Sequence, residues 1–290
     1  MGLIHRASIQ SGGGGNPPGA DASREFARQV ISELNLGPRD IASLQKMDWA
    51  KLNAAANAAA LKVNGPRPRL AHRRAASARV RPVDGSIITI RSFNEAIADS
   101  AKNIPILIGS VSEEGNSMGS RPTEEQWRTT LARVWGDAKG KALADAMIKK
   151  YRKKSIRLLS YGVNGISSRN NVTRMATLKS NQRGAPVYAY YFTWQSPMLE
   201  DAGAWHTAEL AFCFDNTKRC EQGTGNTIEA QALACKMATA WANYAKTGNP
   251  SQPGLVWTPF EAAKCQTMVW DNECRMVNDP EGDLRKILLA

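Results

Sequence analysis

Short apolar runs alternate along the chain with amphipathic segments. The runs IPILIGSV (104–111) and APVYAYYFTW (185–194) are rich in apolar, β-branched and aromatic residues and give way to polar residues, which is typical of strands buried on both faces of a sheet. The shorter run ASIQS (7–11) is closed by glycines and also predicts a buried strand. Two apolar pieces on either side of Asp271 and Asn272 predict a hairpin within 266–279.

Apolar residues at three- and four-residue spacing predict helices over 23–34, 47–63, 123–136, 140–154 and 227–250. Thr123 is a good N-cap for the third of these, and Gly248 with Pro250 ends the last. The stretch 155–184 is polar and carries no predicted element. Strands that alternate with helices in this way indicate the α/β class, with a mostly parallel sheet flanked by helices.

Composition and charge narrow the range of partners. The chain has 290 residues, of which 42% are hydrophobic and 22% charged, as in ordinary globular proteins. No apolar run approaches the roughly 20 residues of a membrane span, so we expect no membrane partner. The net charge is +12, with basic clusters at 65–82 and 148–157. No nucleic-acid motif and no interleaved aromatic residues accompany these clusters, so we interpret them as a solvated loop and a helix surface and expect no nucleic-acid partner.

The five cysteines do not form a recognisable metal or disulfide pattern. Their odd number excludes complete internal pairing, and no CxxC or Cys/His spacing suits zinc, so we expect no metal site. Cys213 and Cys220 could bridge a short loop in an oxidising compartment. The simpler interpretation is that most of the cysteines are small buried hydrophobic residues.

Candidate catalytic residues follow two of the predicted strands. Glu113 and Glu114 come directly after the run 104–111, and His206 lies in a glycine-containing loop after the run 185–194. Loops at the carboxyl ends of parallel strands are where α/β folds place catalytic groups. The order acid then histidine fits the last two members of a Ser, acid, His triad in an α/β-hydrolase.

Several collinear segments resemble the type B carboxylesterases, the family of para-nitrobenzyl esterases and cholinesterases. The segments are GLIHRASIQSG (2–12), IPILIGSVSEEGNSM (104–118), APVYAYYFTWQSP (185–197) and GAWHTAEL (203–210). The resemblance implies an α/β-hydrolase fold that hydrolyses small carboxylic esters through an acyl-serine intermediate, with no cofactor. It also implies that Glu114 is the triad acid, that His206 is the base, and that Ser11 supports the acid through a hydrogen bond. Thr207 stands where many relatives have glycine.

The family's nucleophile lies in a GESAG elbow upstream of its QSG segment, and here QSG begins at residue 10. We therefore expect residues 1–290 to form the C-terminal part of an α/β-hydrolase domain, without the N-terminal strands, the nucleophile elbow and the oxyanion loop. Ser117, in GNSMG (115–119), matches the bare elbow pattern. The polar residues SEEG separate it from the preceding strand, so we interpret it as part of a loop. Ser110, Ser112 and Ser120 lie nearby with no elbow pattern.

These observations predict an ester hydrolase of which this chain holds the acid and the base, and which is inactive as the isolated chain. The alternative is a non-catalytic interaction or scaffold protein built on the same fold. The first strand should lack a neighbour on one side, and such an apolar edge favours self-association. A targeting segment would lie upstream, so the sequence leaves the compartment open, secreted or periplasmic locations included.

Overall fold

The computed structural model describes residues 2–12, 20–64, 96–115 and 121–290. The chain divides into two compact units, Gly15–Ala98 and a larger unit of Met1–Gly14 with Asp99–Ala290. The arginine-rich stretch 65–82, with His72, lies outside the described residues, as do Ser117 and Ser120. That residues 1–290 form one domain stays a prediction.

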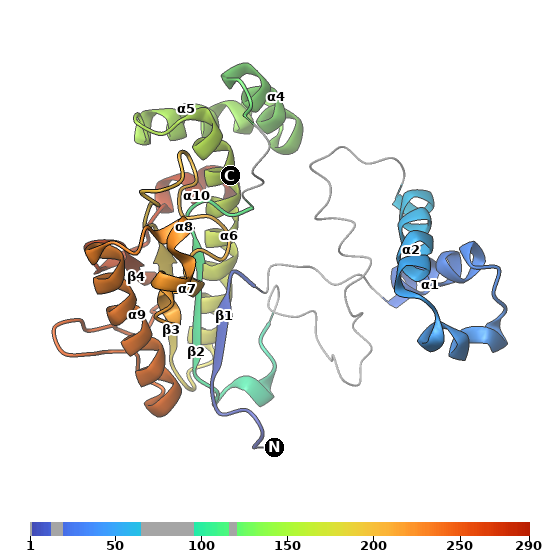
Figure 1. The fold of residues 1–290 in the computed structure, drawn as a ribbon, viewed down its shortest axis with the longest axis horizontal. Coiled ribbons are helices and arrows are strands. Elements are labelled where there is room, and N and C mark those ends of the chain that lie inside the picture. Colours follow the sequence, from blue (N-terminus) through green and yellow to red (C-terminus); the bar gives the residue numbers. More distant parts are fainter. Residues whose placement is uncertain (1, 13–19, 65–95, 116–120) are drawn as a thin grey trace. The chain divides into compact units, whose positions relative to one another are not determined.

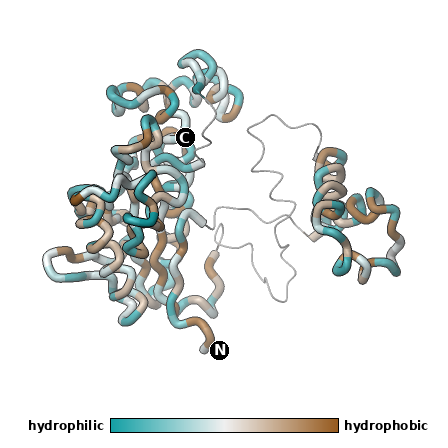
Figure 2. The backbone as a smooth tube through the Cα atoms, in the orientation of Figure 1, coloured by the Kyte–Doolittle hydropathy of each residue, from teal (hydrophilic) through white to brown (hydrophobic). Residues whose placement is uncertain are grey.

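In the smaller unit, the residues that the structure describes between 20 and 64 form a pair of helices with a short connection. Helix α1 (Ala20–Glu33) and helix α2 (Trp49–Asn64) are joined through the 3-10 helix η1 (Pro38–Lys46), which confirms the helices predicted over 23–34 and 47–63. Val30 packs against Ala55 and Ala59 of α2, whose alanine-rich sequence is largely hydrophobic in Figure 2. An ion pair of 2.7 Å between Lys62 and Glu33 also links the two helices.

A five-stranded sheet organises the larger unit (Figure 1). Its strands, in spatial order, are β1 (Ala7–Gln10), β2 (Ile106–Val111), β3 (Val187–Phe192), β4 (Gln266–Trp270) and β5 (Arg275–Asn278). The first four strands are parallel, and β5 forms the expected antiparallel hairpin with β4. The α/β prediction with a mostly parallel sheet is therefore confirmed.

Within the described residues β1 pairs only with β2, so it stands at one end of the sheet. Its residues are partly exposed rather than buried, which corrects the expectation of a buried strand. A strand at the end of a sheet has a partner on one side only, and this explains its exposure. Self-association through this edge stays a prediction.

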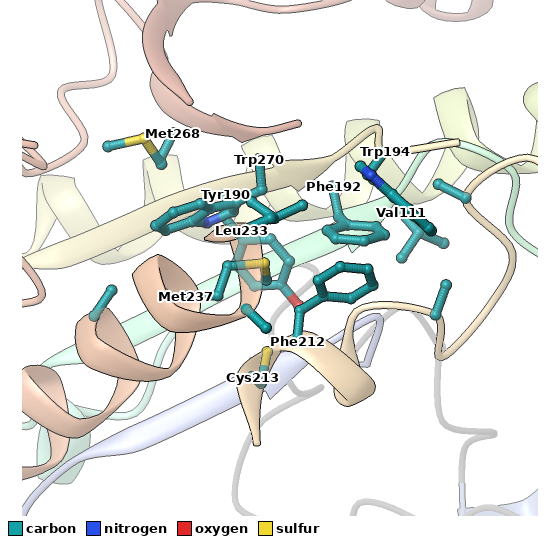
Figure 3. Packing of buried hydrophobic residues seen from close by; sticks show 14 of the residues in the cluster. Val111, Tyr190, Phe192, Trp194, Phe212, Cys213, Leu233, Met237, Met268 and Trp270 are labelled. Carbon is teal, nitrogen blue, oxygen red and sulfur yellow. The ribbon is translucent and has the colours of Figure 1, made fainter. Parts of the chain in front are cut away.

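Strands β2 and β3 are buried along their whole length because helices cover both faces of the sheet. Alternate side chains of a strand point to opposite faces. Tyr190 and Phe192 of β3 therefore pack with Phe212, Leu233 and Met237 on one face (Figure 3). Tyr191 points to the other face, where the guanidinium carbon of Arg169 lies 6.0 Å from the centre of its ring.

The face of Tyr190 is covered by helices α7 (Leu210–Cys213) and α9 (Ile228–Thr247). Helix α9 begins where Thr227 accepts a hydrogen bond of 3.2 Å from Ala230 N, and it ends at Gly248, whose φ of 82° suits glycine. Between α7 and α9 lie the short helices η5 (Thr217–Cys220) and α8 (Glu221–Thr224), and η4 (Asp99–Ala101) precedes β2.

The opposite face is covered by α6 (Ile156–Asn181), and α4 (Glu124–Trp135), α5 (Asp137–Lys150) and α10 (Gly282–Leu289) share a second core with it. Thr123 caps α4 as predicted, since it accepts a hydrogen bond from Gln126 N. The predicted helix 140–154 ends earlier, at Lys150, where Asp283 pairs with the ammonium group at 2.7 Å.

Helix α6 corrects the prediction most strongly, because the polar stretch 155–184 forms a helix of 26 residues. Its N-cap is Ser155, which accepts a hydrogen bond of 3.2 Å from Leu158 N. Its buried positions include Gly165, Arg169 and Lys179, so the side against the sheet is not marked by apolar residues alone. Apolar periodicity, the signal that reveals amphipathic helices, is therefore interrupted here.

The cysteines also depart from their simplest interpretation. All five are free thiols, so Cys213 and Cys220 are not joined. Cys213 is buried in the sheet core, and burial raises the pKa of its thiol. Cys220 and Cys235 are exposed, so the description as small buried hydrophobic residues fits Cys213 alone among the five. Within the residues described, no helix is long and apolar enough to cross a membrane.

Gly165 allows α6 to lie directly against the backbone that follows β2. A Cβ added at this position would stand 1.9 Å from the carbonyl oxygen of Ser112, a backbone atom that cannot rotate away. Helix α6 is therefore in direct contact with the backbone that leads to Glu113 and Glu114. This contact sets the distance between the helix and the residues that follow β2.

We predict that Gly165→Ala destabilises the chain by at least about 1–3 kcal/mol, because the methyl group overpacks a backbone contact. Gly162→Ala in the same helix is the matched control. Its Cβ would meet only the terminal methyl of Met147, at 3.1 Å, and alanine gains up to about 1 kcal/mol in helix propensity. Urea unfolding of both variants measures the difference. Equal unfolding free energies for the two variants would contradict this packing.

Candidate active site

Two loops meet at the carboxyl end of the sheet. The acid loop (112–115) follows β2, and the histidine loop (193–209) follows β3. An isolated parallel bridge pairs Glu113 with Trp205, and Glu113 N donates a hydrogen bond of 3.1 Å to Ala204 O. The bridge places the next residue of each loop, Glu114 and His206, opposite one another.

The side chains of Glu114 and His206 are in hydrogen-bond contact. His206 Nδ1 lies 2.6 Å from Glu114 Oε2. Glu114 is buried, with 3% of its side chain exposed, whereas 51% of the His206 side chain is exposed. Neutral imidazole that donates from Nδ1 to a carboxylate keeps a lone pair on Nε2, and within the described residues no hydrogen bond occupies that nitrogen.

A buried carboxylate that orients a half-exposed imidazole is the arrangement that the acid and the base of a nucleophilic triad require. The carboxylate fixes the tautomer and the ring plane, and the outer nitrogen can accept a proton from a hydroxyl group. Among the described residues, no group of three or more His, Cys, Asp or Glu side chains could hold a metal ion.

Residues 1–283 match the carboxylesterase family. The chain belongs to that family. It is 29% identical over 197 residues to the para-nitrobenzyl esterase of Bacillus subtilis (strain 168), a match that covers 67% of this chain and 40% of that enzyme.

Solved esterases share the fold of this carboxylesterase-family chain. The structure of a thermophilic para-nitrobenzyl esterase superposes with a TM-score of 0.72 and 24% identity, covering 99% of this chain and 58% of the esterase. An esterase from Clostridium hathewayi superposes with a TM-score of 0.68 and 22% identity, covering 99% of this chain and 56% of that structure. The α/β-hydrolase fold class is therefore confirmed, and the chain spans about half the length of the relatives it matches.

The supporting role expected for Ser11 rests on a hydrogen bond that is not formed here. Ser11 directly follows β1, with a φ of 53°, and its backbone N donates to Gly109 O at 2.8 Å. Its hydroxyl is buried and has no hydrogen-bond partner among the described residues. The role of Ser11 toward Glu114 stays a prediction.

The alternative serines that the structure describes are not free to act as nucleophiles. Ser110 is fully buried within β2, and Ser112 donates its hydroxyl proton to the carboxylate of Glu113. Ser117, the only one in an elbow-like pattern, lies outside the described residues.

Glu209 is a buried acid at the site that the sequence pattern did not reveal. Only 1% of the residue is exposed, and it accepts a hydrogen bond of 3.3 Å from the Tyr190 hydroxyl. Burial raises the pKa of this carboxyl, and the nearby charge of Glu114 adds to the effect. The available signal was an acid within the GAWHTAEL segment, three residues after the histidine.

Thr207, which directly follows the histidine, adopts a conformation that favours glycine. Its φ is 78°, in the left-handed region that β-branched residues rarely occupy. The place where many relatives carry glycine is thus a place where glycine removes strain. The departure at residue 207 has a conformational cost rather than a chemical one.

We predict that Thr207→Gly increases the unfolding free energy by about 1 kcal/mol, because left-handed backbone costs a β-branched residue about 1–2 kcal/mol and glycine gives back part of this through its freer unfolded chain. The residue is exposed, so few packing contacts are lost. Thr129→Gly, at an exposed position of helix α4, is the control and should destabilise. Urea unfolding compares the variants, and a destabilising Thr207→Gly would contradict the strain.

We predict that Glu209→Gln stabilises the chain relative to the unmodified protein at pH 7 and much less at pH 4. The raised folded pKa means that the protonated carboxyl favours folding at low pH and that this contribution is lost as pH rises through the folded pKa. Glutamine stays neutral at both values. Unfolding free energies at the two pH values test this, and the same difference at pH 4 and pH 7 would contradict it.

Proposed function

We propose that this chain provides the acid and the base of a carboxylic ester hydrolase, with Glu114 as the acid and His206 as the base. The observation that carries the proposal is the 2.6 Å contact between His206 Nδ1 and Glu114 Oε2 in a member of the carboxylesterase family. The substrates are small carboxylic esters, and the reaction proceeds through an acyl-serine intermediate.

In the first half of the reaction, His206 Nε2 takes the proton of a serine hydroxyl as the serine oxygen attacks the ester carbonyl carbon. Glu114 stabilises the imidazolium that forms and holds its ring. The tetrahedral intermediate then collapses, the carbon–oxygen bond to the alcohol breaks, and the proton passes from Nε2 to the departing alcohol. Water repeats these steps on the acyl-serine and releases the carboxylic acid.

The nucleophilic serine and the oxyanion donors of this reaction come from outside residues 1–290. Two features support this. Ser110 and Ser112 are buried in the sheet and the acid loop, and Ser117 follows the polar SEEG segment rather than a strand. The isolated chain therefore orients an imidazole without supplying the group that it activates.

We predict that the 290-residue chain alone hydrolyses para-nitrophenyl acetate no faster than background, because the nucleophile and the oxyanion hole supply most of the rate. We expect a chimera to hydrolyse it catalytically, when the nucleophile-bearing part of the Bacillus subtilis para-nitrobenzyl esterase precedes this chain. In the chimera, Glu114→Gln should lower kcat by about 10⁴-fold, since the imidazole loses its orienting carboxylate.

His206→Gln in the chimera should lower kcat at least as much, and His5→Gln, at an exposed histidine far along the chain, is the matched control with unchanged kcat. Saturable turnover by the isolated chain, or labelling of one of its serines by a fluorophosphonate probe, would show a nucleophile within the chain. A folded chimera without turnover would favour the scaffold alternative.

A further inference from the structure

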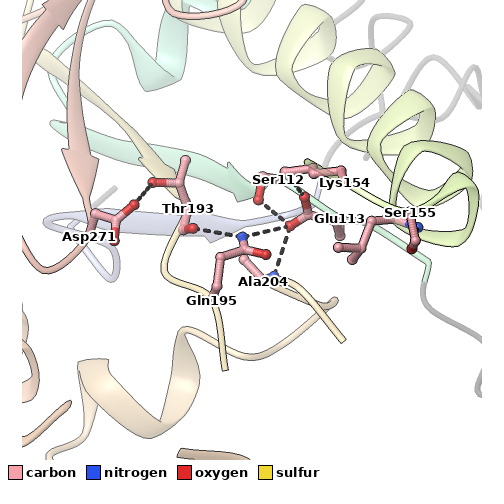
Figure 4. Close-up of polar contacts among 9 residues, drawn as sticks. Ser112, Glu113, Lys154, Ser155, Thr193, Gln195, Ala204 and Asp271 are labelled. Carbon is pink, nitrogen blue, oxygen red and sulfur yellow. Dashed lines mark hydrogen bonds and ion pairs between the residues drawn. The ribbon is translucent and has the colours of Figure 1, made fainter. Parts of the chain in front are cut away.

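Glu113 is a fully buried carboxylate with a donor on every side (Figure 4). Its Oε1 pairs with the ammonium group of Lys154, and its Oε2 accepts hydrogen bonds from the hydroxyl of Ser112, from Ala204 N at 2.8 Å and from Gln195 Nε2 at 3.3 Å. A buried carboxylate is tolerated only when charge and hydrogen bonds compensate its lost hydration, and here they do.

The four donors come from three parts of the fold. Ser112 is in the acid loop itself, whereas Gln195 and Ala204 belong to the histidine loop. Lys154 lies in the turn between α5 and α6, where its ammonium group also stands 4.7 Å from the ring centre of Tyr151. One carboxylate therefore ties the acid loop to the histidine loop and to the start of the helix beneath them.

Glu113 forms hydrogen bonds with both backbone groups of Ala204. Glu113 N donates to Ala204 O at 3.1 Å, and Ala204 N donates back to the Glu113 carboxylate at 2.8 Å. Both backbone groups of a residue two positions before His206 are thus held by one residue. The residue directly after Glu113 is Glu114, so the same segment fixes the positions of both Glu114 and His206, whose side chains form the 2.6 Å contact.

Gly203 allows the close approach of the histidine loop to the Glu113 carboxylate. Its φ is 61°, and a Cβ at this position would lie 2.8 Å from the carboxyl carbon of Glu113. No residue with a side chain fits between the histidine loop and the carboxylate without moving one of them. The close approach is therefore a requirement of the contact rather than a by-product of loop packing.

We propose that Glu113 is a positioning residue, which holds the histidine loop in the register that brings His206 Nδ1 onto Glu114. The role rests on the proposed function, because it matters only where that contact works in catalysis. A purely structural Glu113 would change the stability of the chain and leave the contact intact in whatever fraction stays folded. The two interpretations therefore differ in the geometry of the folded state.

The test is proton NMR of the 290-residue chain, which reads the contact without any need for activity. A histidine Nδ1 proton shared with a carboxylate over a short distance resonates far downfield of the amide protons. The chain has three histidines, so His206→Gln assigns the signal. The unmodified chain should show it and Glu114→Gln should lose it.

Glu113→Gln should shift or broaden this signal at a temperature where circular dichroism shows the variant to be folded. Asp271→Asn is the matched control. Asp271 accepts a hydrogen bond of 2.7 Å from Thr193, a pair drawn in Figure 4 that joins the ends of β3 and β4 and makes no hydrogen bond to Glu113 itself. The signal should stay in place in Asp271→Asn.

An unchanged signal in folded Glu113→Gln overturns the positioning role and leaves the proposed function standing. If the unmodified chain shows no such signal, or if Glu114→Gln retains it, the Glu114–His206 contact is not formed in solution and both proposals fall. Should Glu113→Gln not fold, Gln195→Leu replaces it, because this exposed residue supplies one of the same contacts. A smaller shift supports the role, and no shift overturns it.

The chimera gives a second readout. Glu113→Gln should lower kcat by about tenfold to 10²-fold with KM little changed, since displacing a reacting group by about an ångström has effects of that size. Rescue of part of kcat by Glu113→Asp, which keeps the charge for Lys154, supports positioning. A KM effect with unchanged kcat overturns it.

Discussion

The site depends on the backbone pairing of Glu113 with Trp205. The sheet itself aligns β2 with β3 only as far as Val111 and Phe192, and the histidine lies well beyond the end of β3. A loop as long as the histidine loop (193–209) has many conformations, and fixing one of them costs conformational entropy that contacts must offset. The pairing restores the parallel register beyond the strands, so that residues distant in sequence meet as if they were neighbours in the sheet.

Three acidic side chains near this pairing are distinguished by their surroundings. Glu113 pairs with the ammonium group of Lys154, Glu114 contacts the imidazole of His206, and Glu209 accepts a hydrogen bond from the hydroxyl of Tyr190. Burial raises the pKa of the Glu209 carboxyl. Burial without a cation opposite therefore disfavours the charged form of Glu209, whereas the buried Glu113 has an ion pair.

The fold was predictable wherever burial and residue type agree. The tyrosine-rich strand β3 and the capped helices α4 and α9 follow from local sequence, and family motifs pointed to Glu114 and His206. Helix α6 was not predictable from apolar periodicity, because Gly165 and Arg169 occupy positions against the sheet. The partners of Glu113 were equally hidden, since Lys154 and Ala204 reach it only through tertiary structure. For Ser11, a motif suggested a hydrogen bond to the acid, whereas its hydroxyl has no partner among the described residues.

Glu113 and Glu114 are consecutive residues after β2, and their side chains point in different directions. Glu113 points toward Ala204 in the protein interior, and Glu114 points toward His206. Inserting or deleting one residue between Val111 and Gly115 would exchange the two directions and present the wrong carboxylate to each neighbour. Evolution can therefore vary the side chains of this segment more easily than its length. Among homologues, gaps should be absent from these few positions even where the surrounding loops differ widely in size.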